Sequence, residues 1–107
     1  MVARGDIVWA DLGEPAGRRP VCVLNRDPAI EVLTALTCAP ITRTIRGITS
    51  EVGVGPDEGL PQVSAINCDN LVTVPIAALD QEAVGCLDLD GRIRLDAALR
   101  YALAIEY

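Results

Sequence analysis

The amino-acid sequence predicts a mainly β domain, either a small barrel or a half-open sheet, closed by one C-terminal α-helix. Two patterns support this prediction. Short apolar runs rich in β-forming residues recur up to residue 87, and glycine- or proline-containing loops separate them. After residue 87, apolar residues follow helical spacing instead. At 107 residues the chain has the usual length of one domain, so residues 1–107 are assigned to a single domain.

Five to seven strands are expected. Residues 7–12 (IVWADL) are rich in β-formers, and residues 20–25 (PVCVLN) form an apolar run typical of a strand buried on both faces. Pro20 is expected only at the start of its strand, because proline has no N–H for the ladder. The other strand candidates are residues 33–41, 49–54, 64–68, 71–74 and 83–87. Residues 27–31 are expected to form a turn or one helical turn, and residues 55–61 a loop.

Residues 89–105 are expected to form the helix. Its apolar stripe consists of Leu95, Ala98, Leu99, Ala102 and Leu103. Asp88 is a suitable N-cap. Arg92, Asp96 and Arg100 are spaced four apart, which predicts a charged ladder along another face.

The composition excludes several kinds of catalysis. The chain has no histidine, which rules out a Ser-His-Asp triad, a Cys-His pair, histidine metal ligands and a paired-histidine ribonuclease mechanism. It also has no lysine, so all nine cationic side chains are arginines. Arginine is permanently charged and binds phosphate through two parallel hydrogen bonds.

The four cysteines lack C-x-x-C spacing and are expected to be small buried hydrophobes in a reducing compartment. A four-thiolate zinc site is the alternative, but no metal or cofactor is expected. The sequence has no run of 18 apolar residues and no apolar signal core at its N-terminus. A cytoplasmic protein without a membrane segment is therefore predicted.

The charge is distributed unevenly. The net charge of −6 argues against nucleic-acid binding, but residues 1–50 carry +1 and residues 51–107 carry −7. Four arginines fall in two clusters, one in residues 17–20 (GRRP) and one in residues 42–47 (TRTIRG). Each cluster adjoins a predicted strand, and a strand end holds side chains rigidly. The two clusters are therefore candidates for a local basic site.

Four motifs occur in an order known from one family. Residues 4–12 (RGDIVWADL) match an opening strand of the form G-D-hydrophobic-hydrophobic-W/Y, and residues 17–24 (GRRPVCVL) match G-x-R-P-hydrophobic. Pro40-Ile41-Thr42, with Arg46-Gly47 and Ser50-Glu51-Val52, matches a third-strand exit and a fourth strand, and residues 65–74 (AINCDNLVTV) match a fifth segment. Together the motifs span nearly the whole chain, which thereby resembles the MazF/PemK toxin family.

This resemblance implies an SH3-like β-barrel with a C-terminal helix, usually dimeric. It implies an endoribonuclease that cuts single-stranded RNA at short sequence motifs. In the family pattern the arginine before the second-strand proline and the threonine at the third-strand exit are catalytic, which here are Arg19 and Thr42. The implied partner is a cognate antitoxin whose acidic, flexible tail covers the RNA groove.

The chemistry can also be argued from the residues. RNA carries its own nucleophile, the 2′-hydroxyl, so neither a protein nucleophile nor a metal is required. The protein has to align that oxygen and neutralise charge on the phosphoryl group. Arg19 suits the second task, and the hydroxyl of Thr42 suits contact with a phosphoryl oxygen or the 2′-hydroxyl. The expected RNA-binding residues are Arg18, Arg43, Thr44 and Arg46. The general base is not identified, because the first loop, which contains Glu14, is shorter than in many family members.

Two other functions stay open at this stage. One is a non-catalytic toxin of the same barrel type that binds DNA gyrase, as CcdB does, and the other is a degenerate toxin that only binds its antitoxin. The candidate residues also have structural interpretations. The arginines can be solvated loop charges, Thr42 and Thr44 can satisfy backbone groups, and Trp9 is expected in the core rather than as a base-stacking platform. For Asp69 and Asn70 a turn role is expected.

Overall fold

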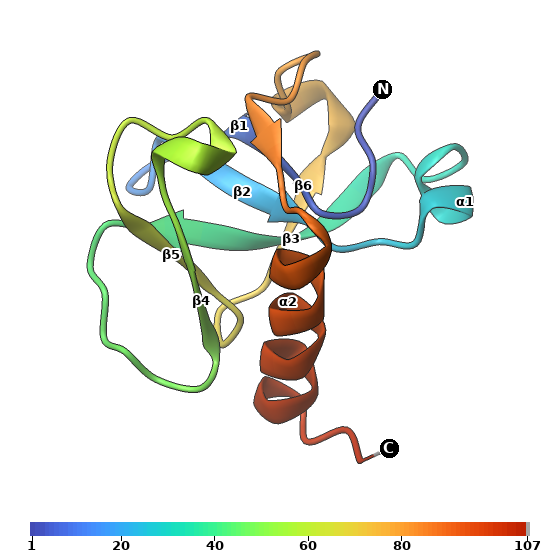
Figure 1. Cartoon of the computed structure of the whole chain (residues 1–107). Helices are drawn as coiled ribbons and strands as arrows, with labels where there is room; N and C mark the ends of the chain where they lie inside the picture. The colour runs from blue at the N-terminus through green and yellow to red at the C-terminus, as the bar shows by residue number, and fades with distance from the viewer. Residues whose placement is uncertain (107) are drawn as a thin grey trace.

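The computed structural model describes residues 1–106 and confirms a mainly β fold with a C-terminal helix (Figure 1). The elements in chain order are β1 (Asp6–Asp11), β2 (Arg18–Val23), α1 (Asp27–Ile30), β3 (Ala35–Thr42), β4 (Glu51–Val54), the 3-10 turn η1 (Pro56–Glu58), β5 (Ser64–Asn67), β6 (Val72–Pro75), the 3-10 turn η2 (Ile76–Ala78), β7 (Gly85–Cys86) and α2 (Leu89–Ala102). Each predicted strand segment overlaps an observed strand, although the ends differ by a few residues.

The strands pair antiparallel in the order β4-β5-β3-β2-β1-β7, and β6 pairs with β3. Strand β3 is shared between two parts of this sheet. Its first half pairs with β6 and its middle with β2, whereas its last residues, Ile41 and Thr42, pair with β5. The sheet therefore bends along β3, and β4 and β5 arch away from β1 and β2 (Figure 1). This is the half-open barrel that the sequence predicts.

Side-chain alternation along the strands produces two cores, one on each face of the sheet. Ile7 pairs with Cys22, and both belong to a core that also contains Leu95 and Ala98 of α2. The neighbouring pair, Val8 and Val21, faces the other way and belongs to a second core with Leu36 and Val74 of β3 and β6. Helix α2 therefore closes one face of the sheet only.

The N-terminus of α2 is capped as predicted. The Asp88 carboxylate accepts a hydrogen bond of 2.7 Å from the backbone N–H of Gly91. A carboxylate at this position satisfies a backbone donor that has no partner within the helix, and it interacts favourably with the helix dipole.

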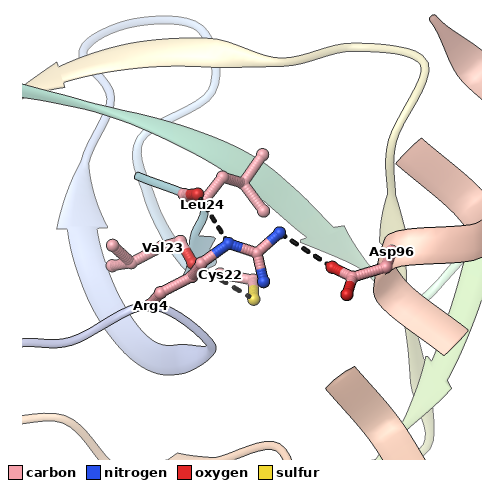
Figure 2. A network of polar contacts seen from close by, with 5 residues as sticks. All are labelled: Arg4, Cys22, Val23, Leu24 and Asp96. Atoms are coloured by element: carbon pink, nitrogen blue, oxygen red, sulfur yellow. Dashed lines mark hydrogen bonds and ion pairs between the residues drawn. The ribbon is translucent and has the colours of Figure 1, made fainter. Parts of the chain in front are cut away.

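The predicted ladder of Arg92, Asp96 and Arg100 is wrong. Asp96 instead forms an ion pair of 2.9 Å with Arg4, whose Nε also donates to the carbonyl oxygen of Leu24 at 3.0 Å (Figure 2). Helical spacing allows an i,i+4 pair, but a partner from the N-terminal segment reaches the same carboxylate. Arg4 thus connects the chain before β1 and the chain after β2 to helix α2.

Pro20 lies inside β2, paired with Trp9, and not at the strand's start as expected. Strand β2 begins two residues earlier, at Arg18, because these arginines continue the ladder with β1. Pairing of β2 with β3 begins only at Val21, so Pro20 lies outside that second ladder, where its missing donor is tolerated.

Three cysteines, Cys22, Cys38 and Cys68, are buried as predicted, whereas Cys86 is exposed. All four are free thiols. Burial raises the pKa of Cys22 to about 12 and those of Cys38 and Cys68 to about 11. Within residues 1–106, no helix has the length and apolar character to cross a bilayer, and no three metal-ligating side chains converge.

Candidate active site

A cavity of about 410 Å³ opens where the β1–β2 loop, the end of β3 and the segment before β5 meet. Figure 1 shows these segments on the same side of the molecule, away from α1. The cavity is lined by Trp9, Ala16, Arg18, Arg19, Pro20, Ile41, Arg43, Leu60, Pro61, Gln62 and Ser64. Both arginine clusters therefore contribute to one cavity, as the sequence suggested.

Arg19 is exposed and has an oriented guanidinium. Its Nε donates a hydrogen bond of 3.1 Å to the carbonyl oxygen of Ala16 in the β1–β2 loop. The loop holds this carbonyl in place through a backbone bond of 2.7 Å from Gly17 to Gly13, and Gly17 has a φ of +70°, which favours glycine. Within residues 1–106, the two terminal nitrogens of Arg19 have no hydrogen-bond partner. The fork of the side chain is thus positioned but available to an anion.

The adjacent Arg18, in contrast to Arg19, is already paired with a carboxylate. Both its terminal nitrogens bind the Asp80 carboxylate, at 3.0 and 2.9 Å. Its Cζ also lies 5.8 Å from the centroid of the Trp9 ring. The hydrogen bond and the opposite charge raise the pKa of Arg18 and lower that of Asp80. Trp9 is half-buried and lines the cavity, so it is only partly the core residue that was expected.

Gln62 and Ser64 complete the cavity wall beside Arg43. Arg43 donates a hydrogen bond of 3.3 Å to the Gln62 side-chain oxygen, and the buried Ser64 hydroxyl donates to the Gln62 carbonyl at 3.0 Å. The pairing of Thr42 with Ala65 brings the start of β5 beside Arg43. Neither residue is predicted from the sequence, because no motif marks them and only the β3–β5 pairing brings them to the cavity.

Thr42 does not line the cavity, although its neighbours Ile41 and Arg43 do. It is half-buried, and its hydroxyl accepts a hydrogen bond of 3.0 Å from the Thr44 backbone N–H. The β2–β3 pairing ends at Val21 and Pro40, two residues short of Arg19 on β2 and of Thr42 on β3, and the last residues of β3 pair with β5 instead. Because side chains alternate, Arg19 belongs to the same face of its strand as Val21, and Thr42 to the same face as Pro40.

Thr44 and Arg46 lie in the exposed loop between β3 and β4, outside the cavity wall. The Glu51 carboxylate accepts hydrogen bonds from the backbone N–H groups of Arg46 and Gly47, at 3.0 and 3.1 Å. These contacts fix the loop backbone. The Arg46 side chain makes no ion pair with any of residues 1–106, so its charge is available on this loop.

Among the described residues, the cavity wall contains three arginines and no carboxylate, although the protein as a whole is acidic. Glu14 is exposed in the β1–β2 loop and does not line the cavity. Asp69 and Asn70 lie in the turn between β5 and β6, as expected, and Asp69 accepts a hydrogen bond of 2.6 Å from the buried Ser50 hydroxyl. The local basic site inferred from the arginine clusters is therefore present.

Comparison with known proteins gives a match to the family of PemK-like, MazF-like toxins of type II toxin-antitoxin systems over residues 3–103. The chain is 46% identical over 78 residues to a probable endoribonuclease, MazF5, of Mycobacterium tuberculosis, which covers 72% of this chain and 71% of that protein. It is 44% identical over 64 residues to endoribonuclease MazF3 of the same species, covering 60% and 62% of the two chains.

Solved structures agree with the sequence comparisons. The Mycobacterium tuberculosis toxin MazF-mt6 superposes with a TM-score of 0.87 at 35% identity, covering 95% of this chain and 99% of that chain. A mycobacterial endoribonuclease in complex with its cognate antitoxin superposes equally well, with a TM-score of 0.87, but at 23% identity it supports the fold alone. The family match, the sequence identities and the shared fold lead to one conclusion: this chain belongs to the PemK-like, MazF-like toxin family of type II toxin-antitoxin systems.

Proposed function

We propose that this chain is a sequence-specific endoribonuclease toxin that cuts single-stranded RNA by attack of the 2′-hydroxyl on the adjacent phosphodiester. The observation that carries the proposal is the oriented fork of Arg19 in a cationic cavity, with its two terminal nitrogens free of any hydrogen-bond partner among residues 1–106. The related proteins are named endoribonucleases, which favours this function over gyrase binding or antitoxin binding alone. Because RNA supplies the nucleophile, the reaction requires no metal ion.

Arg19 and Thr42 are the proposed catalytic residues. Arg19 binds two phosphoryl oxygens and neutralises the charge that develops when the 2′-oxygen bonds to phosphorus. Thr42 is the last residue of the neighbouring strand β3, where its hydroxyl would contact a phosphoryl oxygen or the 2′-hydroxyl. The bond between the 2′-oxygen and phosphorus forms as the bond to the 5′-oxygen breaks, the 2′-hydroxyl proton passes to solvent, and the leaving 5′-oxygen takes up a proton. The products are a 5′-hydroxyl and a 2′,3′-cyclic phosphate, which water opens to a 3′-phosphate. No carboxylate of residues 1–106 lines the cavity, so we assign no general base.

The RNA strand is proposed to run from the cavity along the end of β3 onto the β3–β4 loop. Arg43 lies on the cavity wall, and Thr44 and Arg46 follow it on the exposed loop. Arg18, which precedes Arg19 on β2, also lines the cavity. These side chains would bind consecutive phosphates, and the Gln62 amide offers hydrogen bonds to a base edge inside the cavity.

The proposed assembly is a homodimer neutralised by a cognate antitoxin with an acidic, flexible tail. A mycobacterial structure of the same fold is an endoribonuclease in complex with its cognate antitoxin. An acidic tail complements the arginines of the cavity and would compete with RNA phosphates for them. Since the substrate is cellular RNA, we place the toxin in the cytoplasm.

The test is cleavage of a long single-stranded RNA by purified protein in excess EDTA. The wild type is expected to produce fragments with 5′-hydroxyl ends at a recurring short motif. Arg19→Ala is expected to lower the rate by about 10²–10³-fold, because one charged donor to the transition state is lost. Thr42→Val removes only the hydroxyl and is expected to lower kcat more than it raises KM.

Arg26→Ala is the matched control, since Arg26 is exposed and lies beyond the opposite end of β2. It removes the same charge away from the cavity, and activity is expected to remain at the wild-type level. Undiminished cleavage by a folded Arg19→Ala protein would refute the catalytic assignment. Absence of cleavage by the wild type on every RNA tested, together with gyrase inhibition, would refute the nuclease.

A further inference from the structure

Asp80 occupies the guanidinium fork of Arg18 beside the proposed active site. Two hydrogen bonds of 3.0 and 2.9 Å join the two side chains, which is the geometry in which arginine binds a phosphate. The pair is accessible, since 55% of the Arg18 side chain and 44% of the Asp80 side chain are exposed. The Asp80 carboxylate thus occupies the position at the edge of a cationic cavity where a bound phosphate would contact Arg18.

The backbone fixes Asp80 at this place. Its N–H donates a hydrogen bond of 2.9 Å to the Trp9 carbonyl, and the preceding residue, Leu79, forms a β-bridge with Ala10. The segment after η2 is therefore attached to the edge of β1. Arg18, on β2, extends across Trp9 to reach the carboxylate.

A second carboxylate lies nearer along the ladder but is already engaged. Asp11 pairs directly with Arg18 in the β1–β2 register, yet its side chain accepts a hydrogen bond of 3.0 Å from the backbone N–H of Gly13. Both terminal nitrogens of Arg18 bind Asp80 instead. The choice of partner therefore depends on a residue 62 positions away in the sequence.

We infer that Asp80 is an internal competitor of the nucleic-acid phosphate for Arg18, and that it limits the affinity of the site. This inference rests on the proposed function, because it assigns the competing ligand to the RNA backbone. A phosphate that reaches Arg18 has to displace the Asp80 carboxylate. Asp80 is thus a positioning residue that acts through Arg18, while Arg19 and Arg43 bind phosphate without such displacement.

The test measures binding of a single-stranded oligodeoxyribonucleotide, which has no 2′-hydroxyl and is not cleaved. Asp80→Asn is expected to raise affinity about twofold to fivefold near 0.1 M salt, the range of an exposed ion pair. Because one further phosphate contact forms, the slope of log K against log salt is expected to steepen by about 0.7. Asp80→Glu keeps the carboxylate, so its affinity is expected to stay close to the lower affinity of the wild type.

Glu82→Gln is the matched control. Glu82 lies in the same segment, is exposed and has no hydrogen-bond or ion-pair partner among residues 1–106. It removes the same charge without releasing Arg18, so it is expected to leave the salt slope unchanged. In the double variant Arg18→Gln/Asp80→Asn the gain in affinity is expected to vanish.

Trp9 reports on the ion pair without any nucleic acid, since it is the only tryptophan of the chain. Asp80→Asn is expected to change its emission, and Glu82→Gln is not. The inference is overturned if a wild type that binds the oligonucleotide shows the same affinity and salt slope as Asp80→Asn, or if Glu82→Gln gains as much affinity. Absence of binding and cleavage by every variant would instead overturn the proposed function, and the competitor role with it.

Discussion

Replacement of Arg4 by methionine tests how α2 is held against the sheet. Met keeps most of the length of the side chain but removes two contacts, the ion pair with Asp96 and the hydrogen bond to the Leu24 carbonyl (Figure 2). The Arg4 side chain is 29% exposed and that of Asp96 is 45% exposed, so solvent weakens the ion pair. We assign about 0.5 kcal/mol to it and about 1 kcal/mol to the bond to the carbonyl.

The Arg4→Met protein is therefore expected to lose about 1.5 kcal/mol of unfolding free energy, equivalent to a Tm decrease of about 6 °C for a domain of this size. Urea unfolding followed by Trp9 fluorescence measures this at a fixed protein concentration, because a dimer makes the apparent stability concentration-dependent. Asp96→Asn removes only the ion pair and is expected to cost about a third as much. Equal stability of Arg4→Met and a control Arg26→Met protein would refute the anchoring role.

Two further perturbations test the core. Leu95→Ala removes a fully buried side chain of α2 and is expected to cost about 2–5 kcal/mol, measured by the same urea unfolding; a cost below 1 kcal/mol would mean that α2 does not close this face. Burial raises the pKa of Cys22 to about 12, above its ordinary value of 9.0, so the folded state disfavours the thiolate. Stability is then fully present below about pH 9 and is lost as the pH rises from there towards 12. At pH 8 a thiol reagent is expected to modify only the exposed Cys86 in the folded protein and all four thiols in denaturant; four reactive thiols in the folded state would contradict the buried positions.

The sequence predicts those parts of the fold that depend on local patterns. Strands β1, β2 and β3 follow from apolar runs between breaks, and the cap at Asp88 depends on a hydrogen bond spanning three residues. The predicted charged ladder on α2 does not form, because Arg4, 92 residues away from Asp96, binds the Asp96 carboxylate instead. Tertiary contacts of this kind leave no periodic signal.

In the candidate site, too, some residues are predictable from local patterns and others depend on contacts between distant segments. Arg18, Arg19 and Arg43 are recognisable as two clusters beside strands, and the cavity contains all three. Gln62 and Asp80 have no motif around them, and they become part of the site only through the β3–β5 pairing and the attachment of the segment after η2 to β1. Pairing between distant segments has to be known before such residues can be assigned.

Two adjacent arginines of β2 differ because successive side chains of a strand point to opposite faces. Arg18 emerges beside Trp9 and meets the Asp80 carboxylate, whereas Arg19 emerges on the face of Ala10 and curls to the carbonyl of Ala16. One guanidinium is thereby paired with a carboxylate, and the fork of the other is available to an anion. A shift of the β1–β2 register by one residue would exchange these environments, so the length of the loop at residues 12–17 determines which arginine stays available to the substrate.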